Sequence, residues 1–438
     1  MKTLLLALRN LLRNRRRSIA TIFAMVIGSV SILLFGGYVQ NIIYGLQTGY
    51  VRGGGHLELQ HRDYFLYGSG DPTAYGIMDY QRVIDLLRAD PVLAPMLTVV
   101  TPTLEFGGIA GNFDAGVSRT VFASGVVVDD QNAMQRWNDY GFPDAPETLA
   151  LTGTSEDSAI IGTGVARVLR LCAPLHVSDC PQPVAAPQPA GAEMPADVAR
   201  LAYPDASADA PPGETSTRPH IELLAATTGG APNVARLQVA KAEELGVKEA
   251  NDAFIGLHLG AAQRLLYGRA TPEVTGIALQ LHHTGQIPMA RERIEQLLRS
   301  SLKSAPLAVY DFRALNPYYG QTVGLFSAIF GFIAVLIGAI VLFTVGNTMN
   351  AAVVERTVEI GTLRAMGQRR RGIRRLFISE ALLLGVFGAL LGVVVAKKLG
   401  LIALAGVFFL KFAKIGAIAL VAVAAAFRKL FRRNKAGA

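Results

Sequence analysis

Two long apolar runs without a charged residue constrain what this chain can fold into. Residues 18–51 and residues 314–354 contain no Asp, Glu, Lys or Arg. Each run exceeds the roughly 20 apolar residues that a helix needs to cross about 30 Å of hydrocarbon. The sequence therefore predicts transmembrane helices at residues 18–45 and 319–349. The first run is too long for the core of a cleaved signal peptide, so we expect it to remain as an anchor.

Two further apolar blocks follow the second run. Residues 378–396 are interrupted only by Glu380, whereas residues 399–427 are interrupted by two lysines. We expect a third span at 376–396 and an irregular fourth span at 399–427. A lysine at the bilayer centre costs about 2.5–3.5 kcal/mol on insertion scales, so the alternative is that part of the last block lies along the membrane surface. The basic residues after Phe427 favour the spanning arrangement.

The distribution of charge predicts on which side of the membrane each segment lies. Residues 1–17 carry six basic residues and no acid, residues 355–375 carry seven arginines and two acids, and the tail 428–438 carries five basic residues. By the positive-inside rule these segments are cytoplasmic. Residues 46–318 carry 20 basic and 30 acidic residues, and we expect them outside the cytoplasm. The net charge of +9 is then no sign of nucleic-acid binding.

The predicted fold class is a membrane α-helical protein with four transmembrane helices, one-plus-three, and a large extracytoplasmic α+β domain between helices 1 and 2. Residues 1–17 are expected to form an amphipathic segment in the cytoplasm. Within residues 46–318, β-rich runs predict strands, and helix-like apolar spacing predicts helices. The strands are expected at 57–59, 98–100, 120–122, 221–224 and 277–281, and the helices at 79–88, 162–171, 259–267 and 288–302.

A stretch rich in Pro, Ala, Asp and Ser occupies residues 173–219 and has little apolar periodicity. Such a composition cannot bury enough surface to offset the entropy of ordering, so we expect a flexible insertion there. The only two cysteines, Cys172 and Cys180, lie at its start. On the outer side of a membrane a disulfide between them is expected, and two free thiols are the alternative.

No catalytic or metal-binding motif is visible in the sequence. The one adjacent histidine pair, His282 and His283, would point to opposite faces of a strand. Gly367 and Gly372 have the spacing of the glycines in a phosphate-binding loop, but the Lys-Ser/Thr pair that should follow them is missing. We therefore expect no catalytic residue, no metal and no cofactor in this chain.

A short charged segment, residues 350–375, lies between the second and third predicted spans. The arginines near its end are accounted for by anionic lipid headgroups. The acids Glu355 and Glu359 are not, because an acid contributes nothing to lipid binding or to orientation. Good helix formers favour a helix over residues 355–366. The segment is either an inert loop or the docking element of a cytoplasmic partner.

The run from Glu355 to Gly367, ERTVEIGTLRAMG, resembles the cytoplasmic loop of the FtsX/MacB/LolC–LolE family of ABC transporter permeases. The short run GHLEL at residues 55–59 is similar to the LolE-like branch, and the resemblance covers most of the chain as far as residue 396. It implies an ATPase-coupling role for six residues of the loop: Glu355, Arg356, Glu359, Gly361, Arg364 and Gly367.

The resemblance also implies a mechanism and partners. The chain would be a non-catalytic permease of the bacterial inner membrane, dimerised with a second copy or a paralogue, with its large domain in the periplasm. A separate cytoplasmic ABC ATPase dimer would bind ATP and Mg²⁺, and a loop helix docked on it would pass its closure to the outer domain. Membrane lipids and a lipoprotein or periplasmic protein are the other implied partners.

Three classes of function are compatible with these residues. The first is a permease for lipoprotein release or for export of lipids or hydrophobic compounds. The second is a signalling permease that activates an extracytoplasmic enzyme, and the third is a membrane-anchored structural or receptor protein without an ATPase. In each case the spans carry small residues suited to close helix packing, within the subunit or across a dimer: Gly324, Gly331, Gly338, Gly388 and Gly392.

Overall fold

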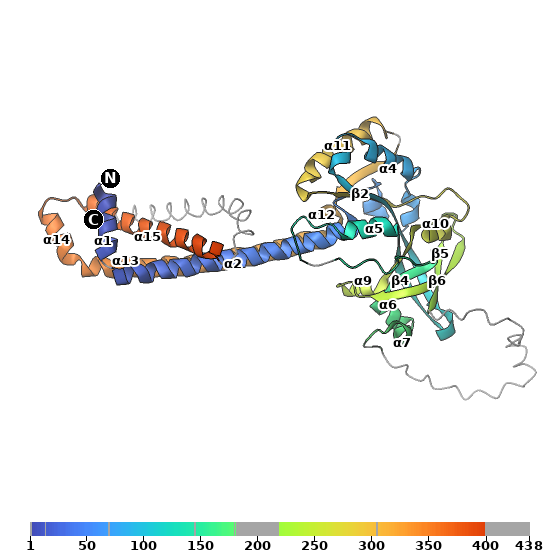
Figure 1. The fold of residues 1–438 in the computed structure, drawn as a ribbon, viewed down its shortest axis with the longest axis horizontal. Helices are drawn as coiled ribbons and strands as arrows, with labels where there is room; N and C mark the ends of the chain where they lie inside the picture. Colours follow the sequence, from blue (N-terminus) through green and yellow to red (C-terminus); the bar gives the residue numbers. More distant parts are fainter. Residues whose placement is uncertain are drawn as a thin grey trace, which may run out of the picture. The chain divides into compact units, whose positions relative to one another are not determined.

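The chain divides into two compact units. The computed structural model describes residues 2–13, 15–68, 71–143, 146–178, 180, 219–303 and 305–398. Unit 1 contains Met1–Gln47 and Pro317–Ala438, and unit 2 contains Thr48–Asn316. Long helices make up unit 1, whereas a mixed sheet with short helices makes up unit 2 (Figure 1). The α+β class expected for residues 46–318 agrees with the architecture of unit 2.

Unit 1 is formed by long apolar helices and by short helices that flank or join them. Its elements are α1 (Lys2–Arg13), the larger part of α2 (Arg15–Gly54), α13 (Pro317–Glu355), α14 (Thr357–Ala365) and α15 (Arg370–Lys398). Within the described residues, three helices are long and apolar enough to cross a membrane, namely Ser18–Gly54 of α2, α13 and α15. The expected fourth span at 399–427 and the tail at 428–438 lie outside the described residues.

Helices α2 and α13 are longer than a bilayer requires. They contain 40 and 39 residues, which corresponds to about 60 Å of helix at roughly 1.5 Å per residue. The hydrocarbon core is about 30 Å thick, so each helix extends beyond its predicted span. α2 contains no proline and is unbroken as far as Gly54. The helix ends there because Gly55 has a left-handed φ of +79°. A glycine is needed at this position, since a Cβ at Gly55 would lie 2.7 Å from the Leu279 carbonyl oxygen.

The glycines predicted to pack helices behave in two ways. A Cβ at Gly388 would lie 2.5 Å from the Cβ of Met25, and a Cβ at Gly392 would lie 2.6 Å from the Cβ of Ser29. These two glycines therefore allow the close approach of α15 to α2. A Cβ at the three predicted positions on α13 would meet nothing within 4 Å in the described chain: Gly324, Gly331 and Gly338. Within the described residues, no neighbouring helix comes close to those three glycines.

Unit 2 is built on a nine-stranded sheet with the order β3-β7-β4-β6-β5-β2-β8-β1-β9. Most neighbours are antiparallel, but β3–β7 and β4–β6 are parallel. A further pairing of β3 with β2 closes six strands into a ring. The strands are β1 (Leu57–His61), β2 (Leu97–Asn112), β3 (Val117–Val126), β4 (Ser158–Gly162), β5 (His220–Ala226), β6 (Pro232–Glu243), β7 (Phe254–His258), β8 (Gly276–Leu281) and β9 (Leu307–Asp311).

Short helices cover the sheet and complete the core. α4 packs against β2, α10 against β3, and α11 against β9, and each contributes buried apolar side chains from one face. The helices of unit 2 are α3 (Tyr64–Tyr67), α4 (Tyr80–Ala89), α5 (Val128–Gln135), α6 (Thr163–Val168), α7 (Cys172–Leu175), α9 (Lys248–Ala253), α10 (Leu259–Tyr267), α11 (Ile287–Ser300) and α12 (Phe312–Leu315).

The elements expected in unit 2 are present, and others accompany them. The five expected strands lie within β1, β2, β3, β5 and β8, and the four expected helices correspond to α4, α6, α10 and α11. The strands β4, β6, β7 and β9 were not predicted from local sequence patterns. The structure joins Cys172 and Cys180 by a disulfide, with their Cα atoms 6.3 Å apart. Most of the expected flexible insertion, residues 181–218, lies outside the described residues.

Candidate functional site

The charged segment between α13 and α15 is not one helix. α13 continues to Glu355, Arg356 leaves the helical path with φ −101° and ψ 22°, and α14 begins at Thr357. The helix expected at 355–366 is therefore α14, and Glu355 belongs to the preceding helix. The break at Arg356 turns its side chain away from the surface. This single residue separates the long apolar helix from the short exposed one.

The Arg356 side chain is buried and paired. Only 10% of the side chain is exposed, and its Nη1 donates to the two carboxylate oxygens of Glu380 on α15, at 3.1 and 3.4 Å. Glu380 is 4% exposed and also accepts a hydrogen bond from Nδ2 of Asn10 on α1, at 2.7 Å. Arg356, one of the six residues with a predicted coupling role, thus lies inside unit 1 and not on its surface. Its carboxylate partner explains why a charge is tolerated there.

A second ion pair joins α14 to α1 at the surface. Arg13 pairs with Glu359 of α14, and both side chains are about half exposed, at 58% and 50%. An exposed pair of this kind contributes roughly 0–1 kcal/mol, so it orients α14 more than it stabilises unit 1. Together with the Glu380 contacts, this pair links α1, α14 and α15 around the N-terminal end of α14, which is called the base of α14 below.

Gly367 ends α14. Its φ of +87° lies in the left-handed region, and its backbone N–H donates to the Arg364 carbonyl at 3.0 Å, while that of Gln368 donates to the Leu363 carbonyl, also at 3.0 Å. A left-handed glycine just after the last turn is the usual way to stop a helix. Gly367, one of the residues of the predicted coupling segment, is therefore a turn residue, and α15 begins shortly afterwards at Arg370.

The face of α14 is open. The helix contains no buried residue, and the predicted residues Glu359, Gly361 and Arg364 are all exposed. Two large apolar side chains stand among them, with Val358 79% exposed and Met366 73% exposed. Exposed apolar side chains on a short charged helix are typical of a helix that lies in a groove on a partner. Both residues lie inside the quoted run from Glu355 to Gly367.

One family model matches this chain over residues 328–434, and its description is FtsX-like permease C-terminal. The matched residues include most of α13 and all of α14 and α15. The resemblance to FtsX-like permeases is confirmed. The match continues past residue 396, where the sequence analysis had ended the resemblance, and so includes the apolar block at 399–427. The chain contains an FtsX-like permease region around the α14 segment.

Three transport proteins are similar in sequence to parts of this chain. The pyoverdine export ATP-binding/permease protein PvdT of Pseudomonas putida is 34% identical over 158 residues, 34% of this chain and 23% of that protein. The lipoprotein-releasing system transmembrane protein LolC of Neisseria meningitidis is 28% identical over 172 residues, 39% of this chain and 40% of that protein. The macrolide export ATP-binding/permease protein MacB of Escherichia coli is 32% identical over 129 residues, 30% of this chain and 20% of that protein.

The matched segments thus cover less than half of each relative's length. These relatives are ABC transporter permeases, and in PvdT and MacB the name joins an ATP-binding part to the permease part. They do not distinguish the LolE-like branch, which stays a prediction. Among solved structures, the extracellular domain of the transporter YknZ from Gram-positive bacteria is 11% identical, covers 58% of this chain and 99% of that structure, and has a TM-score of 0.30.

Proposed function

We propose that this chain is the permease subunit of an ABC transporter, and that it couples ATP hydrolysis by a separate cytoplasmic ATPase dimer to movements of unit 2. The observation that carries the proposal is α14, a short open helix held between two apolar helices within the region that resembles FtsX-like permeases. The chain would be non-catalytic, and ATP and Mg²⁺ would be bound by the partner.

The geometry of the α14 base suits a transmission role. Val358 and Met366 would enter a groove on the ATPase, and Glu359 and Arg364 would pair with groups at its rim. A displacement of α14 would reach α13 through the chain and α15 through the buried pair of Arg356 and Glu380. The buried pair has little freedom to slide, because both groups would lose their partner.

The remaining parts of the proposal concern orientation and cargo. The basic segments at 1–17 and 355–375 support a cytoplasmic position for α1 and α14 in an inner membrane, with unit 2 on the periplasmic side. A second copy or a paralogue would complete the dimer, and the open glycine stripe of α13 fits such a contact. The relatives are named for pyoverdine export, lipoprotein release and macrolide export, which supports a lipoprotein, lipid or hydrophobic cargo.

The test is purification of the tagged full-length chain from membranes of its host, with identification of bound ATPase by mass spectrometry. Val358→Asp should abolish co-purification of the ATPase, because it places a charge in the expected apolar contact. Val247→Asp is the matched control, since Val247 lies in unit 2 and is 56% exposed. Co-purification that is equal for both variants would reject α14 as the docking element, and absence of any ATPase with the wild type would favour an anchored protein without a motor.

A further inference from the structure

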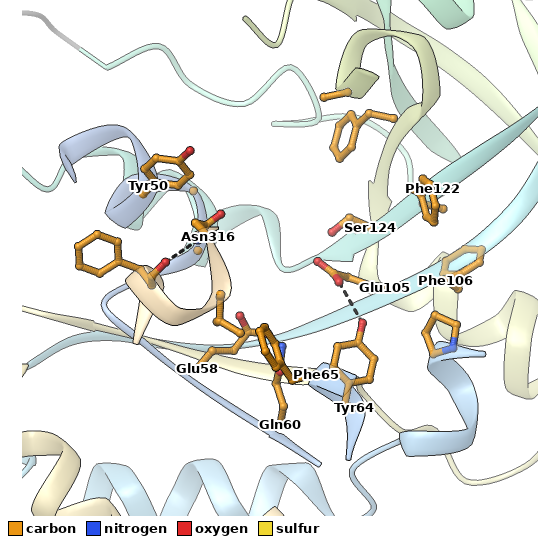
Figure 2. Close-up of a pocket in the computed structure, with 18 of the residues that line it drawn as sticks. Tyr50, Glu58, Gln60, Tyr64, Phe65, Glu105, Phe106, Phe122, Ser124 and Asn316 are labelled. Carbon is orange, nitrogen blue, oxygen red and sulfur yellow. Dashed lines mark hydrogen bonds between the residues drawn. The ribbon is translucent and has the colours of Figure 1, made fainter. Parts of the chain in front are cut away.

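Unit 2 contains a cavity of about 820 Å³ that the coupling function does not use. Its lining comes from the last turns of α2, from β1, β2 and β3, and from α3 and α12, all within unit 2 (Figure 2). A cavity of this size is comparable to sites that hold small organic ligands, which are commonly about 300–1,000 Å³. The open question is which chemistry its walls would select.

Much of the wall is aromatic. Phe65 of α3 is 45% exposed and stacks on Tyr310 with ring centroids 5.4 Å apart. Phe122 of β3 is 63% exposed, and Phe106 of the neighbouring strand β2 also lines the cavity. Aromatic rings left open to a cavity favour the apolar body of a ligand, and their faces also attract cations.

The polar part of the wall contains two carboxylates and the amide of Gln60, beside hydroxyl groups. Glu58 and Gln60 lie on β1, where residues two apart share a face, and Glu105 lies on β2. The Nε2 of Gln60 donates to Oε1 of Glu58 at 3.0 Å, and the Tyr64 hydroxyl donates to Oε2 of Glu105 at 3.0 Å. Within the described residues, neither carboxylate forms an ion pair with a Lys or Arg.

One acceptor is buried without a donor. Gln60 is 5% exposed, and its Oε1 has no hydrogen-bond partner in the described chain. In this orientation the Gln60 amide NH2 donates to Glu58, and the amide oxygen points elsewhere. A buried acceptor without a donor costs free energy that a ligand can recover by donating to it. The neighbouring Glu58 and Glu105 side chains favour a donor that carries positive charge.

We propose that this cavity binds an amphiphile with a primary ammonium group. Its N–H groups would donate to Glu58, Glu105 and Gln60, and its apolar body would lie against Phe65, Phe106 and Phe122. An ammonium group carries three donors and no acceptor, and the wall offers acceptor oxygens on three side chains, of which the Gln60 oxygen has no partner in the described chain. A metal ion fits less well, because the described residues contain no group of three or more His, Cys, Asp or Glu side chains placed to hold one.

The state of Glu58 agrees with this assignment. Burial and the nearby Glu105 carboxylate raise the pKa of Glu58 to about 8, while the hydrogen bond from Gln60 lowers that pKa. Without a cation in the cavity, Glu58 therefore holds a proton near neutral pH, and an arriving ammonium group would displace it.

The experiment measures binding of 4-phenylbutylamine to the purified full-length chain in nanodiscs of phosphatidylcholine, by titration calorimetry. The neutral analogue 4-phenylbutanol and the anion 4-phenylbutyrate serve as ligand controls. We expect the amine to bind at least about tenfold more tightly than the alcohol, the loss typical of a charge-assisted hydrogen bond. Binding needs no ATPase, so the result is independent of the proposed coupling function.

The variants Glu58→Gln and Glu105→Gln should each weaken amine binding by about tenfold, and Glu147→Gln, whose side chain is 91% exposed, should not change it. Glu105 is itself exposed, so Glu105→Gln tests the site even if Glu58→Gln fails to fold. The ammonium group could belong to a lipid headgroup or to a soluble amine, and repeating the titration in nanodiscs with phosphatidylethanolamine distinguishes the two. Weaker apparent binding of the amine identifies the lipid headgroup as a competing occupant. Unchanged binding identifies a soluble amine. Equal binding of amine and alcohol, or no effect of either variant, would overturn the proposal.

Discussion

Removal of the charge on Glu380 tests the buried pair at the base of α14. In Glu380→Gln the guanidinium of Arg356 keeps its burial, with 10% of the side chain exposed, but loses the carboxylate that accepts its two hydrogen bonds. Asn10 retains an oxygen to which it can donate, so its hydrogen bond can persist while the charge is lost. Breaking one side of a buried ion pair costs about 3–5 kcal/mol, and we expect a destabilisation of unit 1 of that size.

The assay is thermal unfolding of the purified full-length chain in detergent, compared with the double variant Arg356→Met/Glu380→Leu. A buried pair replaced as a whole by apolar side chains is often neutral or stabilising, so the double variant should unfold near the wild-type temperature. Glu295→Gln, at an exposed pair on α11, should have no measurable effect. The reasoning fails if Glu380→Gln unfolds like the wild type, or if the double variant is less stable than either single variant.

Two predictions concern the pH dependence of the stability of unit 2, measured by thermal unfolding of the full-length chain across a pH series. Burial raises the pKa of Glu58 in the folded state to about 8. The contribution of Glu58 to the stability of unit 2 is therefore complete below the ordinary pKa of glutamate and is lost as the pH rises through about 8. Glu58→Gln should flatten that decline in stability. Hydrogen bonds from Arg293 and from backbone N–H groups lower the pKa of Asp90. The contribution of Asp90 to stability should therefore be lost as the pH falls through that lowered pKa. Asp90→Asn should remove this loss of stability at acid pH.

Local patterns predicted the long helices and the strands with strong alternation, and they failed where a strand carries an atypical composition. β6 begins with Pro232 and contains charged residues along its length, and β4 and β7 are five residues long with a glycine in each. Such segments become strands because their neighbours in the sheet supply the hydrogen bonds and the burial. No property of the segment by itself shows this.

The candidate site was predictable in outline and not in its internal roles. The position of the charged segment between two apolar runs was visible, but Arg356 looked like any other arginine of that segment. Its burial depends on Glu380 in the next helix and on Asn10 at the start of the chain. In the same way, the alternation of Glu58 and Gln60 on one face was visible, whereas their approach to Glu105 depends on how β1 and β2 are placed around the cavity.

The unbroken course of α2 has a consequence for changes in its length. Inserting one residue into an α-helix advances all that follows by about 1.5 Å and rotates it by roughly 100° about the axis. Inserting seven residues leaves a rotation of only about 20°. Within unit 2, the last turns of α2 lead directly into the turn at Gly55, so a residue inserted between Thr48 and Gly54 rotates those turns against β1. Insertions of near-whole heptads there should therefore be tolerated better than single-residue insertions.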